Sequence, residues 1–322
     1  MVEQQSVIDM CDVVFDEQGW RAYLHALLGS APRYLEVFAG RFGRLRGQSA
    51  ASVMRAFAAD PGHTIGSLAE RLGATEPHAH IARLAADDIR AQVVHGGPWP
   101  TAHGTVNDLV AAQVAAHPER LIGWAGVSLR NPDSALTEAT RALAELRMTG
   151  LSIIPFLDGV DVADQVHDPL WRLCVEHDVP VWIHSGQHFR TTVPAGISAP
   201  SVIDRIAGRH PDLRIILGHG GWPWVLEAVA LLQRHPRVYL EFSSHDPATM
   251  AAAGSGWEPL FLHGTRSIRR QVMFGSTSWT HGRSVREIAD RADQLPIDED
   301  TRHDWLYGNA ERMLRLDAVV SR

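Results

Sequence analysis

Two histidines stand at the ends of short apolar runs in the middle of the chain. His184 closes the run in PVWIHSG, His219 closes the run in LRIILGHGG, and a glycine follows each within two residues. A continuous apolar run is typical of a parallel strand that is buried on both faces. In α/β barrels the catalytic side chains lie just past the carboxyl ends of such strands. We therefore expect His184 and His219 to meet at one barrel mouth and to act there as an acid/base pair.

Two further strand ends carry residues that could do chemistry. Cys11 lies in SVIDMCD near the start of the chain, and Thr277 follows FGS near its end. We interpret Cys11 as a nucleophile or proton donor, with an inert buried side chain as the alternative. Thr277 does not titrate near neutral pH, but its hydroxyl can orient a water or a substrate oxygen. Both residues join the two histidines in the predicted catalytic set.

Several polar and aromatic residues near the predicted strand ends could bind a substrate. Arg190 in HSGQHFR and Arg130 in VSLRN could each clamp a carboxylate through two hydrogen bonds, although exposed ion pairs are the alternative for both. Aromatic walls suit a flat, apolar ligand. The predicted substrate-binding set is Arg190, His188, Arg130, Trp222, Trp279 and Glu241.

The elements that position these residues follow from the alternation of segments. From residue 89 onward, strand-like runs alternate with helical stretches such as SALTEATRALAELRMTG, and with SVIDMCD the chain holds eight strands. Repeated βα units of this kind indicate an α/β fold whose parallel sheet closes into a (β/α)₈ TIM barrel. An open doubly wound sheet is the alternative, but no glycine-rich phosphate loop follows the first strand. We expect one domain over residues 1–322.

Residues 13–88 make a segment too long for a simple crossover between the first two strands. The segment holds several amphipathic stretches, among them WRAYLHALLG and RYLEVFAGRF. We interpret it as a helical insertion on the mouth side of the barrel, where long loops usually shape a pocket. Packing without a further role, or an oligomer contact, is the alternative. His78 and His80 form the chain's His-x-His, but on a helix they point to different sides and make no chelate.

Composition excludes several function classes. All 30 basic residues are arginine, which rules out a lysine Schiff base, a lysine general base and a carbamylated lysine between two metals. The net charge of −7 without a basic block argues against a nucleic-acid partner, and no apolar stretch is long enough to span a membrane. Two cysteines and the absence of an export signal predict a cytoplasmic protein. We expect a small-molecule substrate, with a homo-oligomer left open.

Four motifs together resemble one known family. The stretches VWIHSG, LGHGGWPW and FGS, with the tail YGNAERMLRL, are similar to those of the amidohydrolase-related family, in the branch that contains aminocarboxymuconate-semialdehyde decarboxylase. The resemblance covers the chain from the first strand to the carboxyl terminus, apart from the insertion. It implies a TIM barrel with chemistry at the strand ends.

The same resemblance implies a divalent metal, but three ligand positions differ in this chain. The family places a His-x-His after the first strand, a histidine after the fifth, often one after the sixth, and an aspartate after the eighth. His184 and His219 match, whereas Cys11 and Val13 stand in place of the His-x-His and Thr277 in place of the aspartate. We therefore expect no metal and no cofactor. The alternative is a rebuilt zinc site made from Cys11, His184 and His219, with Asp12 nearby.

These observations favour a metal-independent enzyme of the amidohydrolase type. We expect it to hydrolyse an ester, lactone or amide, or to rearrange a small aromatic or carbonyl-bearing substrate, through its histidines. A decarboxylase of an aromatic or unsaturated carboxylate, with or without zinc, is the first alternative. A barrel that binds a ligand but no longer catalyses is the second.

Overall fold

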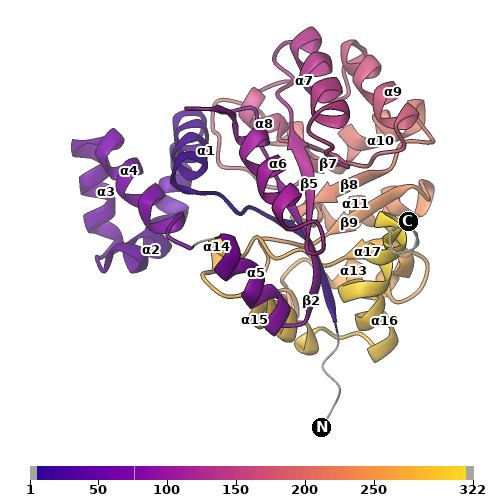
Figure 1. Ribbon diagram of the computed structural model, residues 1–322. Helices are drawn as coiled ribbons and strands as arrows, with labels where there is room; N and C mark the ends of the chain where they lie inside the picture. Colours follow the sequence, from indigo (N-terminus) through magenta and orange to yellow (C-terminus); the bar gives the residue numbers. More distant parts are fainter. Residues whose placement is uncertain (1–5, 76, 317–322) are drawn as a thin grey trace.

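The structure, a computed structural model, describes residues 6–75 and 77–316. Its centre is an eight-stranded parallel sheet in the order β1-β2-β5-β6-β7-β8-β9-β10 (Figure 1). The strands are β1 (Val7–Asp12), β2 (Ile89–His95), β5 (Leu121–Gly126), β6 (Leu151–Ile153), β7 (Val181–His184), β8 (Ile215–Gly218), β9 (Val238–Glu241) and β10 (Val272–Met273). Each lies within one of the predicted apolar runs, so the predicted TIM barrel is confirmed. A small ribbon pairs β3 (Pro100–Thr101) with β4 (Gly104–Thr105).

The barrel closes through a few backbone hydrogen bonds between its first and last strands. Met10 N donates to Phe274 O over 2.9 Å, and Thr277 N donates to Cys11 O over 2.7 Å. These bonds link β1 to the segment that follows β10, so that the two ends of the sheet meet. The closure brings Cys11 and Thr277 together although 266 positions separate them in the chain.

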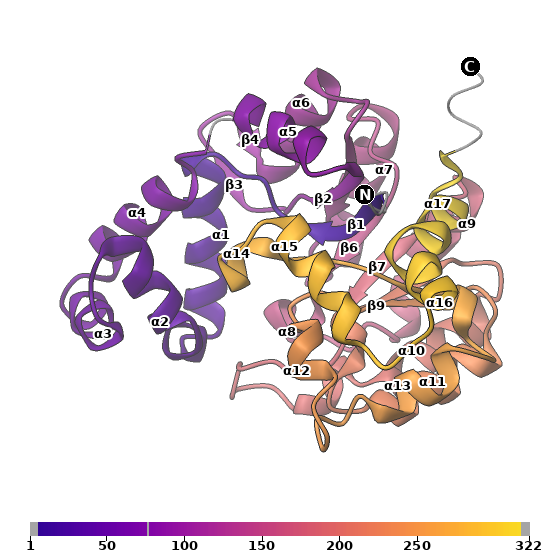
Figure 2. The same ribbon diagram turned by 90° about the horizontal axis from the view of Figure 1, so that it is seen from below.

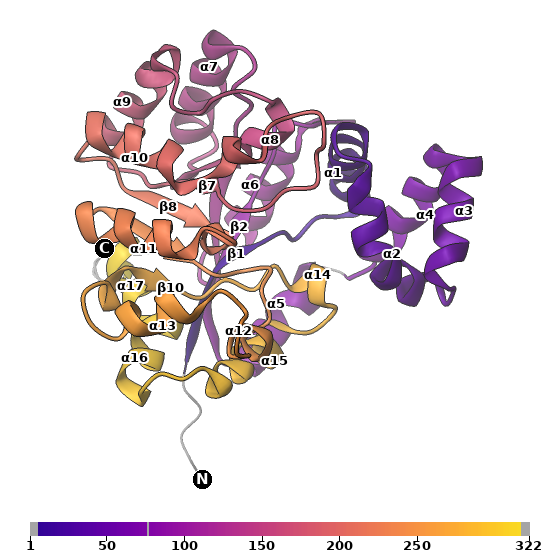
Figure 3. The ribbon, with the colours of Figure 1, turned by 180° about the vertical axis from the view of Figure 1, so that it is seen from behind.

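Helices surround the sheet and connect successive strands (Figure 3). The helices after the insertion are α6 (Val106–Ala116), α7 (Pro132–Ala144), α8 (Pro155–Asp158), α9 (Asp168–Glu176), α10 (Pro200–Arg209), α11 (Val225–Arg234), α12 (Pro247–Met250), α13 (Glu258–Gly264), α14 (Ser278–His281), α15 (Val285–Asp290), α16 (Glu299–His303) and α17 (Asn309–Leu314). Several begin with a side-chain cap, such as Asn131, which accepts from Ser134 N at the start of α7.

Two apolar layers hold the barrel together. The inner layer fills the space between the strands and includes the fully buried side chains of Ile8, Met10 and Trp124. The outer layer packs the strands against the helices. In β1 a register shift between Asp9 and Asp12 interrupts the usual alternation, so that Cys11 joins Met10 in the inner layer. This irregularity turns the thiol toward the barrel axis.

The segment between β1 and β2 is helical, as expected. It contains α1 (Glu17–Ser30), α2 (Arg33–Arg46), α3 (Ala50–Ala59), α4 (Pro61–Leu72) and α5 (Pro77–Ala86). Helices α3 and α4 stand apart from the helices around the barrel, whereas α2 contacts α14 and α5 packs against β2 (Figure 2). The exact bounds of the insertion and the single domain over 1–322 stay predictions, and that domain begins and ends on residues outside the described ones.

None of the helices in the described chain combines the length and apolarity needed to cross a bilayer. The predicted location in the cytoplasm and the homo-oligomer stay predictions. The first five residues, on which the argument about an export signal partly depends, lie outside the described residues.

Candidate active site at the barrel mouth

One cavity opens at the carboxyl ends of the strands. Cys11, His184, His219 and Thr277, the predicted catalytic set, all line it. They come from the end of β1, the end of β7, the residue after β8 and the segment after β10. The structure thus brings together four residues from distant parts of the chain. Their catalytic roles stay predictions.

The residues after β8 adopt an unusual backbone conformation. His219, Gly220 and Gly221 all have positive φ angles, of 61°, 70° and 71°. A Cβ atom at Gly220 would lie 2.4 Å from the ring of Trp257, so only glycine fits there. His219 is the one non-glycine residue of the three, and strained backbone of this kind often occurs at functional sites. The two glycines let the chain turn sharply enough to aim the His219 ring into the mouth.

A hydrogen-bond chain fixes the orientation of His219. The Ser243 hydroxyl donates to Glu241 Oε1 over 3.0 Å, and His219 Nδ1 lies 2.7 Å from the same hydroxyl oxygen. Because the hydroxyl has one proton and gives it to the carboxylate, Nδ1 must donate to Ser243. The other ring nitrogen, Nε2, then keeps its lone pair. His219 is therefore held as a base or a metal ligand through Nε2.

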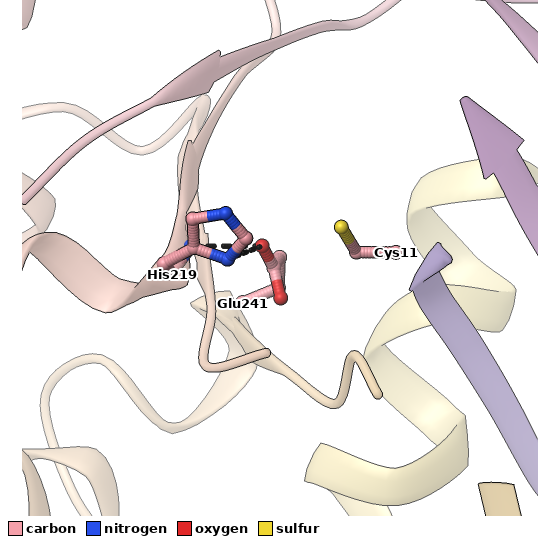
Figure 4. Close-up of side chains that lie close together, drawn as sticks. All are labelled: Cys11, His219 and Glu241. Atoms are coloured by element: carbon pink, nitrogen blue, oxygen red, sulfur yellow. Dashed lines mark hydrogen bonds and ion pairs between the residues drawn. The ribbon is translucent and has the colours of Figure 1, made fainter. Parts of the chain in front are cut away.

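Glu241 supports this chain from behind the cavity wall. Its side chain is fully buried, and Oε1 also accepts from the Trp182 indole over 2.9 Å and from His219 N over 2.8 Å. Figure 4 shows the carboxylate beside the His219 ring, opposite the Cys11 thiol. The interpretation of Glu241 as a substrate-binding residue needs correction, since Glu241 is not among the side chains that line the cavity. It positions His219 instead.

His184 lies in an apolar part of the same cavity. Its ring makes edge contacts with Phe156 and His219, with centroids 4.6 Å and 5.1 Å away. Nδ1 is buried and has no hydrogen-bond partner among the described residues. Burial, followed by the nearby His219, lowers the pKa of His184 well below its usual range.

The other mouth imidazoles are also kept neutral. Burial lowers the pKa of His219 to about 4 and that of His95 to about 4. The ordinary histidine pKa holds only for a solvated ring, so it does not apply to these buried residues. At neutral pH both His184 and His219 are therefore uncharged.

The thiol of Cys11 is in surroundings that oppose its ionisation. Burial raises the pKa of Cys11 well above its ordinary value, and the Glu241 carboxylate adds to this rise. Its Sγ lies 3.6 Å from Thr277 Oγ1. Because the thiolate is the reactive form, these surroundings disfavour the predicted role as a nucleophile.

The predicted arginine clamps lie elsewhere. Arg190 Nη1 donates to the carbonyl oxygens of Phe156 and Leu157, both over 2.8 Å. Arg130 lies 3.3 Å from Asp158 in a pair whose arginine side chain is 59% exposed. Neither lines the mouth, and no other arginine does among the described residues. Both predictions of a carboxylate anchor at the mouth are therefore corrected, because these guanidinium groups hold backbone loops.

Of the three remaining residues predicted to bind substrate, two line the cavity and one does not. Trp222 and Trp279 line the cavity as expected. His188 does not, since its ring stacks on Phe156 at 5.1 Å and its Nε2 lies 3.3 Å from Pro194 O. His188 is corrected to a residue that packs beneath the mouth.

Sequence reasoning missed the contribution of the insertion to the cavity wall. Helices α1 and α2 supply aromatic side chains that were not singled out, namely Tyr23, Tyr34 and Phe38. Tyr34 stacks on Phe38 at 5.7 Å, and Phe38 contacts Trp279 of α14 at 4.9 Å. The amphipathic pattern of these helices predicts a buried face, but it does not show which cavity that face covers.

One group of side chains could hold a metal ion. Cys11, His219 and Glu241 each offer one ligand atom, and these atoms lie within 4.8 Å of one another. A thiol, an imidazole and a carboxylate form a donor set that suits zinc better than a hard cation. The free Nε2 lone pair of His219 fits this interpretation. The raised pKa of Cys11 means that binding would have to displace the thiol proton.

Comparisons with known proteins identify the relatives of this chain. The sequence model of the amidohydrolase family matches residues 58–316. The decarboxylase orsB of Emericella nidulans is 27% identical over 185 residues, which cover 51% of this chain and 53% of that protein. The gamma-resorcylate decarboxylase of Rhodococcus jostii is 26% identical over 255 residues, which cover 66% of this chain and 75% of that one. The predicted resemblance, and with it an enzyme of the amidohydrolase superfamily, is confirmed.

A solved structure with the same fold contains a bound metal ion. A dihydroxybenzoic acid decarboxylase from Polaromonas sp. JS666, with bound manganese and 2-nitroresorcinol, has a TM-score of 0.63 at 15% identity. The match covers 98% of each chain. The chain spans about half the length of the fungal relative, 53%, so the activity itself is a matter for proposal.

These findings overturn two expectations. The curated relatives are decarboxylases, which contradicts the prediction of a metal-independent hydrolase. The manganese in the related structure, together with the group of Cys11, His219 and Glu241, contradicts the prediction of no metal and no cofactor. The loss of family ligands does not exclude a metal in this chain, because Glu241 at the end of β9 offers another donor.

Proposed function

Because the chain belongs to the amidohydrolase family, we propose that its barrel mouth decarboxylates a small aromatic carboxylate, as a carbon–carbon lyase. The observation that carries the proposal is the composition of the cavity wall. Aromatic side chains and neutral imidazoles line it, and no arginine does among the described residues. The names of the curated relatives support the same reaction.

A wall of this kind favours loss of carbon dioxide. The carboxylate of the substrate carries a full charge, whereas the departing carbon dioxide is neutral. A cavity without an arginine gives the carboxylate little stabilisation, and it therefore lowers the energy gap to a transition state in which the charge is more dispersed. Decarboxylation gains from such surroundings more than hydrolysis does, because hydrolysis of an ester or amide develops charge on an oxygen.

The insertion and the strand ends together would bind the ring of the substrate. Tyr23 contacts Trp99 and Trp279, with centroids 5.1 Å and 6.0 Å apart. Trp222 lines the mouth from the segment after β8, and its indole donates to Ser255 O over 2.9 Å. Large, fixed aromatic surfaces select flat ligands and exclude water from the reacting carbon.

Cys11, His219 and Glu241 are the residues that would hold a metal ion. When bound, a cation there would hold and polarise an oxygen of the substrate. The chain's own contribution is to keep His219 in the tautomer with a free Nε2, through Ser243 and Glu241.

His184 is the proposed carrier of the proton that replaces the carboxyl group. His184 is uncharged at rest, and its lowered pKa makes the imidazolium that forms when it takes up a proton from water a strong acid. The bond between the ring carbon and the carboxyl carbon then breaks, its electron pair forms a new C–H bond with this proton, carbon dioxide leaves, and His184 returns to its neutral form. Thr277 has no acidic proton near neutral pH, so it can orient the substrate but cannot supply this proton.

The test is an assay for carbon dioxide release from gamma-resorcylate and a panel of other hydroxybenzoates. The protein is first stripped of metal and then supplied with zinc or manganese. We expect release from at least one acid, dependent on the added metal, and loss of at least about 100-fold in the His184→Asn variant. Hydrolysis of aryl esters without any release of carbon dioxide from the acids would contradict the proposal.

A further inference from the structure

A second cleft lies between the insertion and the helices that follow β10. Four arginines line it, one each from α2, α4 and α5 and one from the turn between α14 and α15, namely Arg41, Arg71, Arg83 and Arg283. The cleft shares only Val13 and Trp279 with the mouth cavity among the described lining residues. It is therefore a separate cavity with a common wall.

The charge of this cleft is opposite to that of the chain. The whole chain has a net charge of −7, yet the cleft is lined by four arginines and two carboxylates, Asp87 and Glu287. Arg283 pairs with Asp246 over 3.5 Å, so the uncompensated charge belongs to the other three arginines. Glu287 is already engaged, because it accepts from Ser284 N over 2.7 Å in a helix cap. The side chain of Arg83, which lines the cleft, has no hydrogen-bond or ion-pair partner among the described residues. The wall thus carries an excess of positive charge.

Two of the arginines are held in place by neutral groups. Arg41 Nε donates to Trp279 O over 2.9 Å, and Arg71 Nη1 donates to Leu45 O over 3.0 Å. Neither has a carboxylate partner among the residues that the structure describes. Partial burial, followed by the neighbouring Arg44, lowers the pKa of Arg41. Carbonyl partners fix the direction of these guanidinium groups but leave their charge uncompensated.

The backbone near Arg41 is shaped to receive its side chain. Gly282 has a φ of +67°, and a Cβ atom there would lie 2.8 Å from Arg41 Nε. Any other residue at this position would push the guanidinium away and would strain the turn. A glycine that makes room for a charged side chain indicates a built position for Arg41.

The cleft also has an apolar side. Phe15, Trp20, Leu45, Leu84 and Val285 contribute to its lining beside the arginines. The arginines alone can hold a bare oxyanion, and these apolar surfaces add contacts for an organic one. A ligand with an anionic end and a small apolar body matches both sides of the cleft.

We propose that this cleft is a binding site for a small organic anion that carries a phosphate or carboxylate group. Guanidinium groups bind both kinds of oxyanion through paired, charge-assisted hydrogen bonds. Arg71 and Arg83 contact the ligand most directly, because Arg83 has no other partner among the described residues and Arg71 only a carbonyl. The site does not depend on the proposed decarboxylation.

The experiment is isothermal titration of the intact protein with pyrophosphate and, separately, with citrate, at constant ionic strength. We expect one ligand per chain from at least one of the two probes. The Arg83→Gln variant should bind it about tenfold more weakly, and the Arg71→Gln/Arg83→Gln double variant should weaken it further. A response to pyrophosphate identifies a phosphate ligand, and a response to citrate alone identifies a carboxylate.

Two control variants separate this site from general charge effects and from the mouth. Arg55→Gln removes an exposed arginine of α3 that bonds only Ser52, so probe binding should be unchanged. His219→Asn alters the mouth and should also leave it unchanged. The proposal is overturned if neither probe binds the wild-type protein, or if Arg83→Gln behaves as Arg55→Gln does. It is equally overturned if His219→Asn abolishes binding that Arg83→Gln retains.

Discussion

Val13 and Trp279 separate two cavities that treat charge in opposite ways. On the mouth side the described lining contains four imidazoles that burial keeps neutral and no arginine. On the other side four arginines gather, two of them bound only to carbonyl groups. The chain has 30 arginines, so the described mouth lacks arginine although this residue type is common in the sequence.

The difference shows what each cavity can do with an anion. A site that stabilises a carboxylate binds it well but slows any reaction in which that charge is dispersed. The mouth lacks such stabilisation, which suits a step that destroys the carboxylate. The cleft can stabilise an anion through its arginines, which suits a ligand that binds and dissociates without reacting. The following changes would break or sharpen this contrast.

The largest effect is expected from removing a mouth imidazole. His219→Asn should lower turnover on the aromatic acid by about 10²- to 10⁴-fold, because asparagine cannot offer a basic nitrogen at the Nε2 position. The measurement is kcat from carbon dioxide release, with circular dichroism to verify the fold. His78→Asn, on the exposed side of α5, is the matched control and should keep full turnover. Equal rates for both variants would remove His219 from the mechanism.

The neutrality of the mouth predicts a pH-dependent stability. The folded pKa of His95 is about 4, below the ordinary value of 6.5. As the pH falls from about 6.5 to about 4, the unfolded chain takes up a proton at this position and the folded chain does not. Stability contributed by the neutral ring is present above this window and is lost within it, by about 3 kcal/mol.

Urea unfolding at pH 7, 6, 5 and 4 measures this effect against the His95→Gln variant. Other titrating groups are common to both proteins, so the difference isolates His95. The wild-type protein should lose more stability on acidification than the variant does. Parallel curves would show that His95 is not kept neutral by the fold.

Zinc uptake tests whether the mouth binds a metal ion, which would bring a positive charge that no arginine of the described lining supplies. The stripped protein should take up about one zinc ion, and Cys11→Ala should weaken uptake about tenfold or more by removing one of three donors. Cys174→Ala, at a buried cysteine of α9, is the control for loss of a thiol. The measurement is zinc content after dialysis. Equal zinc content in both variants would exclude Cys11 as a ligand.

A smaller effect is expected from adding a charge to the mouth. Gln187 lines the cavity and is exposed, so Gln187→Arg places a guanidinium there without disturbing the core. We expect a lower KM and a kcat reduced several-fold, because the added charge stabilises the bound carboxylate more than the transition state. Gln187→Met keeps the length without the charge and serves as the control. An increase in kcat would contradict the proposed benefit of an uncharged wall.

The parts of this molecule that sequence predicts best are those fixed by local pattern. The apolar runs before His184 and His219 marked two strands, and the mouth follows because parallel strands end on one side. The parts that failed depend on groups far apart in the chain. Burial of His184 comes from Phe156 among others, so its pKa cannot be read from its own segment.

The arginines and Glu241 failed for a related reason. Arg190 stands in a mouth loop in sequence, but two backbone carbonyls of another segment satisfy its guanidinium and turn it away. Glu241 ends a strand, as a catalytic carboxylate would, yet its oxygens accept from Trp182, His219 and Ser243. Which hydrogen bond a polar side chain makes is decided by tertiary contacts that no short motif encodes.

Trp279 gives the two cavities a means of thermodynamic communication. Its ring lines the mouth, it also borders the cleft, and its carbonyl oxygen accepts from Arg41. If an anion that draws on Arg41 changes the affinity of the mouth for its aromatic ligand by some factor, the aromatic ligand changes the affinity of the cleft for the anion by the same factor. A single indole would then make the barrel mouth responsive to the concentration of a second metabolite, without that metabolite ever entering the reaction.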